Sequence, residues 1–282
     1  MVRILLGDCL DRLKELPDES VHCCVTSPPY FGLRDYGHAG QIGLENSPQD
    51  FVDKLVEVFR EVRRVLRNDG TLWLNLGDTY AGSGGAGNQF GQIQNGLAKY
   101  KQKGRPKDIG LKPKDLIGIP WKVAFALQAD GWFLRQDIIW HKPNPMPESV
   151  TDRCTKAHEY IFLLSKNERY YFDSDAIKEL ANGQDAADTL RNKRSVWQVN
   201  LQPFSGAHFA TFPPALIMPC VLAGCPEGGT VLDPFGGAGT TGLTSESHER
   251  NSILCEINPE YADLAEKRIR ESNPMFTEII RS

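Results

Sequence analysis

The chain has 282 residues, of which 40% are hydrophobic and 24% are charged, an ordinary composition for a globular protein. Its apolar runs are too short to cross a bilayer, and its first residues, MVRILLGDCL, lack a signal-peptide pattern, so we expect a cytoplasmic protein without membrane contact. The net charge of −4 excludes a generally basic nucleic-acid binder, and any DNA contact would need a local basic patch. The seven cysteines include no Cys-x-x-Cys pair, so neither a disulfide framework nor a metal site is expected.

The first 80 residues alternate between predicted strands and helices. Periodicity predicts a strand over 2–8, a short amphipathic helix over 9–17 and a second strand over 21–27. Ser47 is the expected N-cap of a long amphipathic helix that ends at Gly70, and a third strand follows immediately. This alternation is typical of an α/β protein with a parallel sheet.

Residues 81–118 interrupt the alternation with a glycine-rich stretch and a run of lysines and arginines. We expect either a solvated loop or a mobile basic lid that grips phosphates when a substrate binds. Beyond it the pattern predicts a helix, a turn at Gly131 and a strand, and then a strand over 158–166 with a hairpin partner over 169–173. Residues 174–204 are polar and only weakly periodic.

The last 70 residues are again regular. A helix with a proline-marked start is followed by a strand, a glycine turn and a helix, and then by a strand with an acidic tip and a final helix. The succession of elements along the chain predicts an α/β fold with a doubly wound, mostly parallel sheet.

The predicted second strand ends in an unusual stretch, VTSPPYFGLRDYG, which begins at Val25. Prolines cannot donate to a sheet and they fix their own φ, so the strand must stop there. Taken alone, the stretch is either a plain strand terminus or a rigid loop that presents Tyr30 to a flat ligand.

A second motif, VLDPFGGAGTTG over 231–242, joins an apolar strand to a helix through a glycine turn. Glycines there let backbone amides approach a ligand closely. The next strand ends in Glu256, and an acid at that position can accept both hydroxyls of a ribose. No lysine follows the glycines and the GxGxxG spacing is absent, so a nucleoside without phosphates, such as S-adenosylmethionine, is favoured.

Together, TSPPY and DPFGGAGTT resemble the catalytic motif (D/N/S)PP(Y/F) and the methyl-donor motif DPFxGxGTT of the DNA amino-methyltransferases. The catalytic motif comes first here, an order similar to that of the family's β group, which is a circular permutation of the usual methyltransferase sheet. IIWHKPNPMP, HEYIFLLSK and HFATFPPALI agree as well, so the resemblance spans nearly the whole chain except 81–114 and 174–202.

This resemblance implies a single Rossmann-like methyltransferase domain over 1–282 that binds S-adenosyl-L-methionine, with 81–118 as a basic loop and about 174–204 as a small target-recognition segment. Glu256 would bind the ribose and Asp8 the adenine amino group, although Asp8 is also typical of a simple turn. The donor-binding residues that the resemblance implies are Asp8, Thr211, Phe212, Asp233, Pro234, Phe235, Gly237, Gly239, Thr240 and Glu256.

The implied catalytic residues are Ser27, Pro28, Pro29 and Tyr30. Ser27 Oγ and the Pro28 carbonyl oxygen would accept the protons of an exocyclic amine, while Tyr30 would stack on a base flipped out of double-stranded DNA. Serine at the first position resembles the cytosine-N4 enzymes, whereas aspartate or asparagine accompanies adenine-N6.

The implied function is therefore site-specific transfer of a methyl group to cytosine N4, with adenine-N6 methylation as the alternative. The alternative from another functional class is a DNA-binding protein that has the same fold and has lost its catalytic activity. A separate cognate restriction endonuclease as a partner stays open, as does the choice between a monomer and a homodimer. The target sequence would be read mostly by the 174–204 segment, whose candidates are Arg191, Lys193, Arg194 and Trp197.

Overall fold

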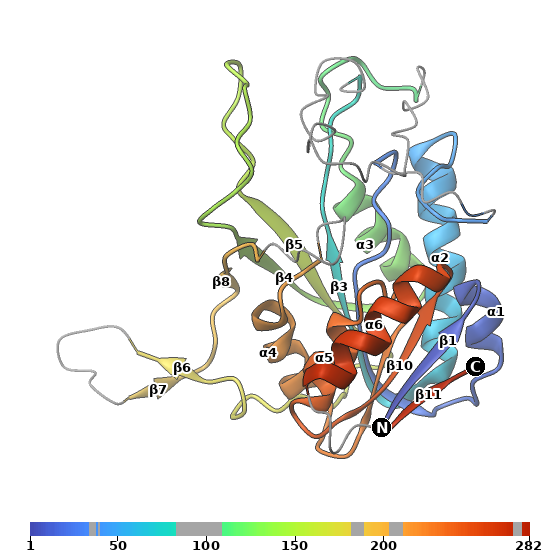
Figure 1. The fold of residues 1–282 in the computed structure, drawn as a ribbon. Helices are drawn as coiled ribbons and strands as arrows, with labels where there is room; N and C mark the ends of the chain where they lie inside the picture. The colour runs from blue at the N-terminus through green and yellow to red at the C-terminus, as the bar shows by residue number, and fades with distance from the viewer. Residues whose placement is uncertain (34–37, 39, 83–108, 182–188, 203–210, 273–277) are drawn as a thin grey trace.

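The computed structural model describes residues 1–33, 38, 40–82, 109–181, 189–202, 211–272 and 278–282. Strands and helices alternate along most of the chain (Figure 1). In chain order they are β1 (Val2–Leu6), α1 (Cys9–Lys14), β2 (Val21–Thr26), α2 (Pro48–Val65), β3 (Leu66–Leu76), α3 (Ile119–Ala129), β4 (Phe133–His141), β5 (His158–Ser165), β6 (Glu179–Leu180), β7 (Leu190–Arg191), β8 (Val196–Gln198), α4 (Pro214–Gly224), β9 (Thr230–Asp233), α5 (Thr240–Glu246), β10 (Asn251–Glu256), α6 (Pro259–Ser272) and β11 (Ile279–Arg281).

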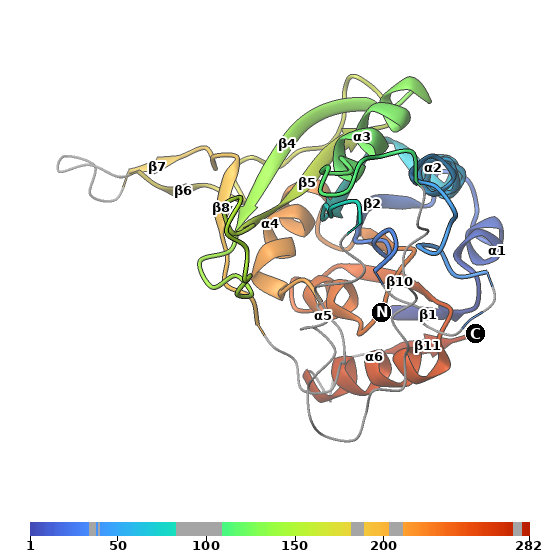
Figure 2. The same ribbon diagram turned by 90° about the horizontal axis from the view of Figure 1, so that it is seen from above.

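One large sheet organises the described residues. Its nine strands lie in the order β11-β1-β10-β9-β2-β3-β5-β4-β8, and β5 runs antiparallel to both of its neighbours while the other described strand pairs of this sheet are parallel. Helices cover both faces, with α1, α2 and α3 on one side and α4, α5 and α6 on the other (Figure 2). The predicted doubly wound, mostly parallel Rossmann-like sheet is confirmed.

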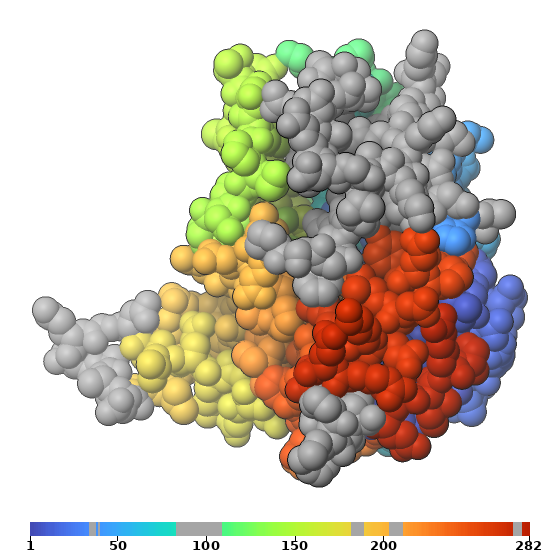
Figure 3. Space-filling view, viewed as in Figure 1, coloured from blue at the N-terminus to red at the C-terminus, as the bar shows by residue number. Residues whose placement is uncertain are grey.

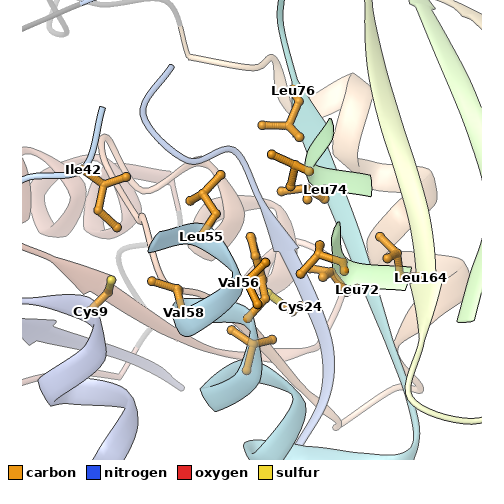
Figure 4. Packing of buried hydrophobic residues seen from close by; sticks show 14 of the residues in the cluster. Cys9, Cys24, Ile42, Leu55, Val56, Val58, Leu72, Leu74, Leu76 and Leu164 are labelled. Carbon is orange, nitrogen blue, oxygen red and sulfur yellow. The ribbon is translucent and has the colours of Figure 1, made fainter. Parts of the chain in front are cut away.

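Helix α2 and the sheet make the largest core. The predicted Ser47 cap is present, since its Oγ accepts from the Asp50 N–H at 3.1 Å. Leu55 of α2 is buried in one cluster with Cys24 of β2 and Leu72 of β3 (Figure 4). Successive strand side chains point to opposite faces, so Trp73 lies in a separate cluster against α4.

Helix α2 does not end at Gly70 as predicted. It stops at Val65, and the chain passes directly into β3 at Leu66. The pairing of β2 with β3 then shifts from Val21–Leu66 to Cys23–Thr71, so residues 67–70 form an irregularity at the start of the strand. Gly70 belongs to that irregularity, where an added Cβ would lie 3.0 Å from the Arg67 carbonyl oxygen.

The predicted hairpin partner of β5 over 169–173 is also wrong, because these residues are not a strand. Their backbone N–H groups bond elsewhere: the Tyr171 N–H to the Asp69 carbonyl oxygen and the Asp173 N–H to the Ala223 carbonyl oxygen, each at 2.9 Å. The segment therefore links the start of β3 to the end of α4. Strand β11, for which the sequence analysis made no prediction, pairs with β1 at the edge of the sheet.

Several predictions concern residues that the structure does not describe. Most of the basic loop (83–108) and parts of the target-recognition segment and its flank (182–188 and 203–210) lie outside the described residues. Among the helices that are described, none is both long and apolar enough to cross a membrane.

Candidate functional site

Polar side chains follow the carboxyl ends of neighbouring parallel strands. Asp8 comes after β1, Glu256 and Asp233 end β10 and β9, and Ser27 comes directly after β2. Because these strands are adjacent in the sheet, their tips meet at one edge, where doubly wound sheets bind ligands. All four residues line one cavity of about 230 Å³.

Glu256 joins two parts of the cavity wall. Its carboxylate accepts from the Gly237 N–H at 2.7 Å and from the Asn258 N–H at 2.8 Å, which ties the glycine turn to the tip of β10. Burial raises the pKa of the Glu256 carboxyl to about 7, against the lowering effect of these backbone hydrogen bonds. A carboxylate offers about four acceptor sites, so these two backbone hydrogen bonds leave acceptor capacity for a ligand.

Asp233 has a different kind of environment. It is 1% exposed, and its carboxylate accepts from the hydroxyls of Thr26 and Thr241 at 2.6 Å each and from the Phe235 N–H at 3.0 Å. Burial raises its pKa, and the hydrogen bonds oppose that shift. Asp233 thus lines the cavity and also braces the ends of β2 and β9 and the start of α5.

Of the remaining predicted donor-binding residues, all but Gly239 line the cavity. Asp8 caps α1 through its Oδ1, which accepts from the Leu10 N–H at 2.9 Å, and it also lines the cavity, so both interpretations of Asp8 apply. Gly239 is not among the described residues of the cavity wall: it begins α5 with φ +75°, and an added Cβ would lie 2.8 Å from Ala265 Cβ of α6. Those that do line the cavity are Thr211, Phe212, Pro234, Phe235, Gly237 and Thr240.

The rigid loop after β2 brings its four predicted residues to the same cavity. The hydroxyl of Tyr30 donates to Glu159 Oε2 at 2.7 Å. Its ring lies against Gly77, where an added Cβ would be 2.5 Å from Tyr30 Cε2, so a larger residue at position 77 would displace the ring. Tyr30 is therefore held at its hydroxyl and along one side of its ring.

Three polar residues of this wall were not singled out from the sequence: Asn75 of β3, Lys142 after β4 and Glu159 of β5. For Asn75 and Lys142 the signal was a polar residue at the end of an apolar strand, the same signal that pointed to Glu256. Glu159 needed one further fact, because β5 is antiparallel and presents its first residues, not its last, at this edge, whereas Lys142 follows the last residue of β4, which runs parallel to β3. Asn258 and Tyr261, from the start of α6, line the cavity as well.

The cavity suits a nucleoside-type methyl donor. An acid at the tip of β10 lines it together with apolar Phe235 and Ile257, as a ribose and an adjoining flat base require. No cluster of three or more potential metal-ligating side chains occurs in the part of the chain that the structure describes. Fold and cavity thus define a doubly wound α/β protein with a nucleoside site at its sheet edge.

Comparison with known proteins identifies the family. Residues 21–267 match the family model for N6/N4 methyltransferases, described as DNA methylase. The Type II methyltransferase M.SmaI of Serratia marcescens is 52% identical over 267 residues, which span 95% of this chain and 90% of that protein. M.Cfr9I of Citrobacter freundii is 51% identical over 276 residues, with 98% and 89% covered. The chain belongs to the DNA methylase family, as its two motifs predicted.

Solved structures agree on the fold. A DNA modification methylase of Thermus thermophilus, described as putative and complexed with S-adenosyl-L-methionine, aligns with a TM-score of 0.67 at 25% identity and covers 99% of this chain and 100% of that one. The cytosine-N4-specific PvuII DNA methyltransferase aligns with a TM-score of 0.69 at 20% identity, over 99% and 94% of the two chains. At that lower identity the PvuII similarity concerns the fold alone.

Proposed function

We propose that this protein transfers a methyl group from S-adenosyl-L-methionine to the exocyclic N4 of a flipped cytosine in double-stranded DNA. One observation supports this most directly: the Ser27-Pro28-Pro29-Tyr30 loop and the donor-type residues Glu256 and Asp8 line the same cavity. A donor held by the acid and the glycine turn would then have its reactive end within reach of a base held by the loop.

S-adenosyl-L-methionine is the methyl donor of this family, and it supplies an electrophilic methyl group on a sulfonium. Within the cavity, Glu256 would accept from the ribose hydroxyls and Asp8 from the adenine amino group. Thr211 and Phe212 would line the methionine end. Gly237 lies at φ +50° with its N–H on Glu256, so the turn that lines the donor site is held in place before any ligand binds.

The catalytic loop would act on the amine. The lone pair of an exocyclic amine is delocalised into the ring, so the nitrogen is a weak nucleophile. Ser27 Oγ and the Pro28 carbonyl oxygen would accept the two amine protons and favour a tetrahedral nitrogen, and the prolines keep these acceptors in position. Tyr30 would stack on the base, a contact worth about 1–3 kcal/mol in single-stranded binders.

Cytosine is proposed over adenine because the first residue of the motif is Ser27. Adenine-N6 methylation by the same architecture is the second candidate. A protein that binds DNA without turnover is a third, and the intact motif and the cavity that adjoins it argue against that hypothesis.

The DNA would also contact the hairpin formed by β6 and β7. Glu179 of β6 accepts from Arg191 Nε at 3.1 Å and Arg194 Nε at 3.0 Å, and Lys193 Nζ lies 4.0 Å from its second oxygen. The Arg194 side chain is 62% exposed. We assign this hairpin to the target-recognition segment, because arginines read base edges and neutralise phosphates.

The relatives M.SmaI and M.Cfr9I are named Type II methyltransferases, which supports a role beside a separate restriction endonuclease. The domain assignment, a single catalytic domain over 1–282 that includes the basic loop, is part of the same proposal.

The test is to express the protein in a host without DNA methylation, then analyse the nucleosides of its DNA by mass spectrometry and sequence the modified positions. N4-methylcytosine at one short recurring sequence is the expected result. N6-methyladenine without N4-methylcytosine would contradict the choice of base. Tight DNA binding without transfer of labelled methyl groups would support the inactive alternative.

A further inference from the structure

A connected polar cluster lies beside Tyr30 in the cavity. Glu159 Oε2 accepts from the Tyr30 hydroxyl at 2.7 Å and from Asn75 Nδ2 at 3.3 Å, while its Oε1 accepts from Lys142 Nζ at 2.5 Å. These four residues and Ser27 line the same cavity. One carboxylate therefore joins the ring on which a base would stack to a cation in the same wall.

Lys142 is held in a defined and largely dry position. Its side chain is 13% exposed, and that of Glu159 is 16% exposed. The Lys142 ammonium lies 4.2 Å from the centroid of the Trp140 ring, which stabilises a positive charge. Trp140 is itself fixed, since its Nε1 donates to the Val199 carbonyl oxygen at 2.8 Å.

The ammonium has donor capacity beyond this ion pair. Lysine carries three N–H donors and no acceptor. Within the described part of the chain, Glu159 is the hydrogen-bond acceptor that Lys142 Nζ contacts. N–H groups are thus left for an acceptor on whatever enters the cavity, and a buried cation favours an acceptor there strongly.

The two candidate bases differ in what they offer to such a donor. Along its Watson–Crick edge, cytosine has the N4 amine followed by two acceptors, N3 and O2. Adenine has the N6 amine, one acceptor at N1 and a C–H at the position that corresponds to O2. If Ser27 and Pro28 hold the amine end, a cation at the other end meets an oxygen in cytosine and a C–H in adenine.

We propose that Lys142 is a specificity-determining residue that donates a hydrogen bond to O2 of the flipped cytosine. Glu159 is its positioning residue, because it orients both the ammonium and the Tyr30 ring. This inference rests on the proposed function and adds to it the group that distinguishes the base. The serine motif then holds the amine, and Lys142 distinguishes the cytosine ring from the adenine ring by the oxygen at O2.

The experiment uses the full chain and a duplex with the target sequence found by sequencing. The target position holds either cytosine or a 2-aminopyridine C-nucleoside, which keeps the amine and the ring nitrogen of cytosine and lacks O2. Single-turnover methylation rates are measured for the wild-type protein, for Lys142→Met, and for Lys14→Met as a control. Lys14 is exposed, on α1.

For the wild-type protein we expect cytosine to react faster than the analogue, with about 10- to 100-fold of the rate ratio due to this contact, the range for one hydrogen bond to a charged group. Lys142→Met should react slowly with both substrates and lower the cytosine-to-analogue ratio by about that factor relative to wild type, while Lys14→Met keeps the wild-type ratio. Each protein is measured on both substrates, and the rate ratio of the variant is compared with that of the wild type. Any difference in intrinsic reactivity between the two amines then cancels.

A Lys142→Met protein that keeps the wild-type ratio would overturn the assignment of Lys142. Donor binding within about twofold of wild type verifies that the variant is folded, and Glu159→Gln, which retains the ammonium but weakens its anchor, should give an intermediate ratio. If Lys142→Met does not fold, an unchanged ratio in Glu159→Gln overturns the proposal instead. Methylation of adenine alone by the wild-type protein would contradict the proposed function, and this is seen in the first sequencing step.

Discussion

At the scale of single residues, the proposed ribose-binding role of Glu256 would make binding of the methyl donor depend on pH. Its carboxyl is buried at the tip of β10, and burial raises its pKa to about 7. Only the ionised form can accept from both ribose hydroxyls, since the protonated form must donate one hydrogen. Below pH 7 donor binding therefore requires loss of a proton, and affinity should fall as the pH falls.

This predicts a pH-dependent dissociation constant for S-adenosyl-L-methionine. Titration calorimetry between pH 8.5 and 6 should show an affinity that does not change above about pH 7. Below that pH the affinity should fall by up to about tenfold per pH unit. Glu256→Gln should bind the donor about 10- to 100-fold more weakly at pH 8 and lose this part of the dependence. Ionisation of the donor itself affects both proteins equally, so identical pH profiles for the two would contradict the role of Glu256.

At the scale of elements, the buried hydrogen bonds of Asp233 connect the two motifs. The Thr26 hydroxyl at the end of β2 and the Thr241 hydroxyl at the start of α5 both donate to this carboxylate. Thr26 directly precedes Ser27, so this bridge fixes the catalytic loop relative to the glycine turn. We expect Thr26 to be a positioning residue that keeps the amine acceptors aligned with the methyl donor.

Thr26→Val keeps the shape of the side chain and removes the hydroxyl. It should lower the free energy of unfolding by about 1–3 kcal/mol, because a buried carboxylate loses a donor. It should also lower kcat by about tenfold while the donor dissociation constant changes less than about threefold, as measured by single-turnover kinetics and calorimetry at a temperature where the variant is folded.

Thr26→Ser, which restores the hydroxyl, is the matched control and should recover most of kcat. A Thr26→Val protein with wild-type kcat and reduced stability would mean that the bridge is structural only. A parallel loss of donor affinity would place its effect at the glycine turn.

Most elements of the fold could be predicted because their signals are local. The Ser47 cap, the helical spacing of α2 and the strand–turn–helix around Asp233 each depend on neighbouring residues alone. Gly70 was misinterpreted because glycine marks helix ends and strand irregularities equally well. The segment 169–173 was mistaken for a strand because its aromatic residues favour strands, whereas its hydrogen-bond partners, Asp69 and Ala223, are distant in sequence.

The candidate site also contains residues that could be predicted from the sequence and residues that could not. Glu256 was found because an acid at the tip of a parallel strand indicates a ribose site, whereas Asp8 was implied by the family resemblance. Glu159 was not found, since its place at that edge depends on the reversed direction of β5, and Lys142 was overlooked although it follows the end of β4, which runs parallel to β3. The bracing role of Asp233 could not be predicted either, because a motif specifies the residue and not whether its carboxylate faces the cavity or the hydroxyl of Thr26.

At the scale of the whole molecule, the cavity and the proposed DNA-reading hairpin occupy different regions. The hairpin of β6 and β7 projects from the side of the sheet that carries β8, well away from α6 (Figures 1 and 3). With a net charge of −4, the protein as a whole does not attract DNA, so local cations must supply that attraction. Arg191, Lys193 and Arg194 gather on Glu179 and form such a local group.

Changing this group should therefore affect DNA binding and leave donor binding unchanged. For the double variant Arg191→Gln with Arg194→Gln, we expect the slope of log K against log salt concentration to become shallower by roughly 1 to 2, about 0.9 for each lost phosphate contact. Fluorescence anisotropy with a labelled target duplex at several salt concentrations measures this slope. The dissociation constant for S-adenosyl-L-methionine should stay within about twofold of wild type, because neither arginine lines the cavity.

Arg270→Gln removes an arginine from an exposed ion pair with Glu266 on α6 and changes the net charge by one unit. Arg270 is distant from the hairpin, so its loss should leave the slope unchanged and separate a local contact from the effect of overall charge. If the double variant also kept the wild-type slope, the hairpin would not contact phosphates, and the DNA would have to lie on another face of the molecule. A shallower slope in both variants would instead point to the overall field of the protein.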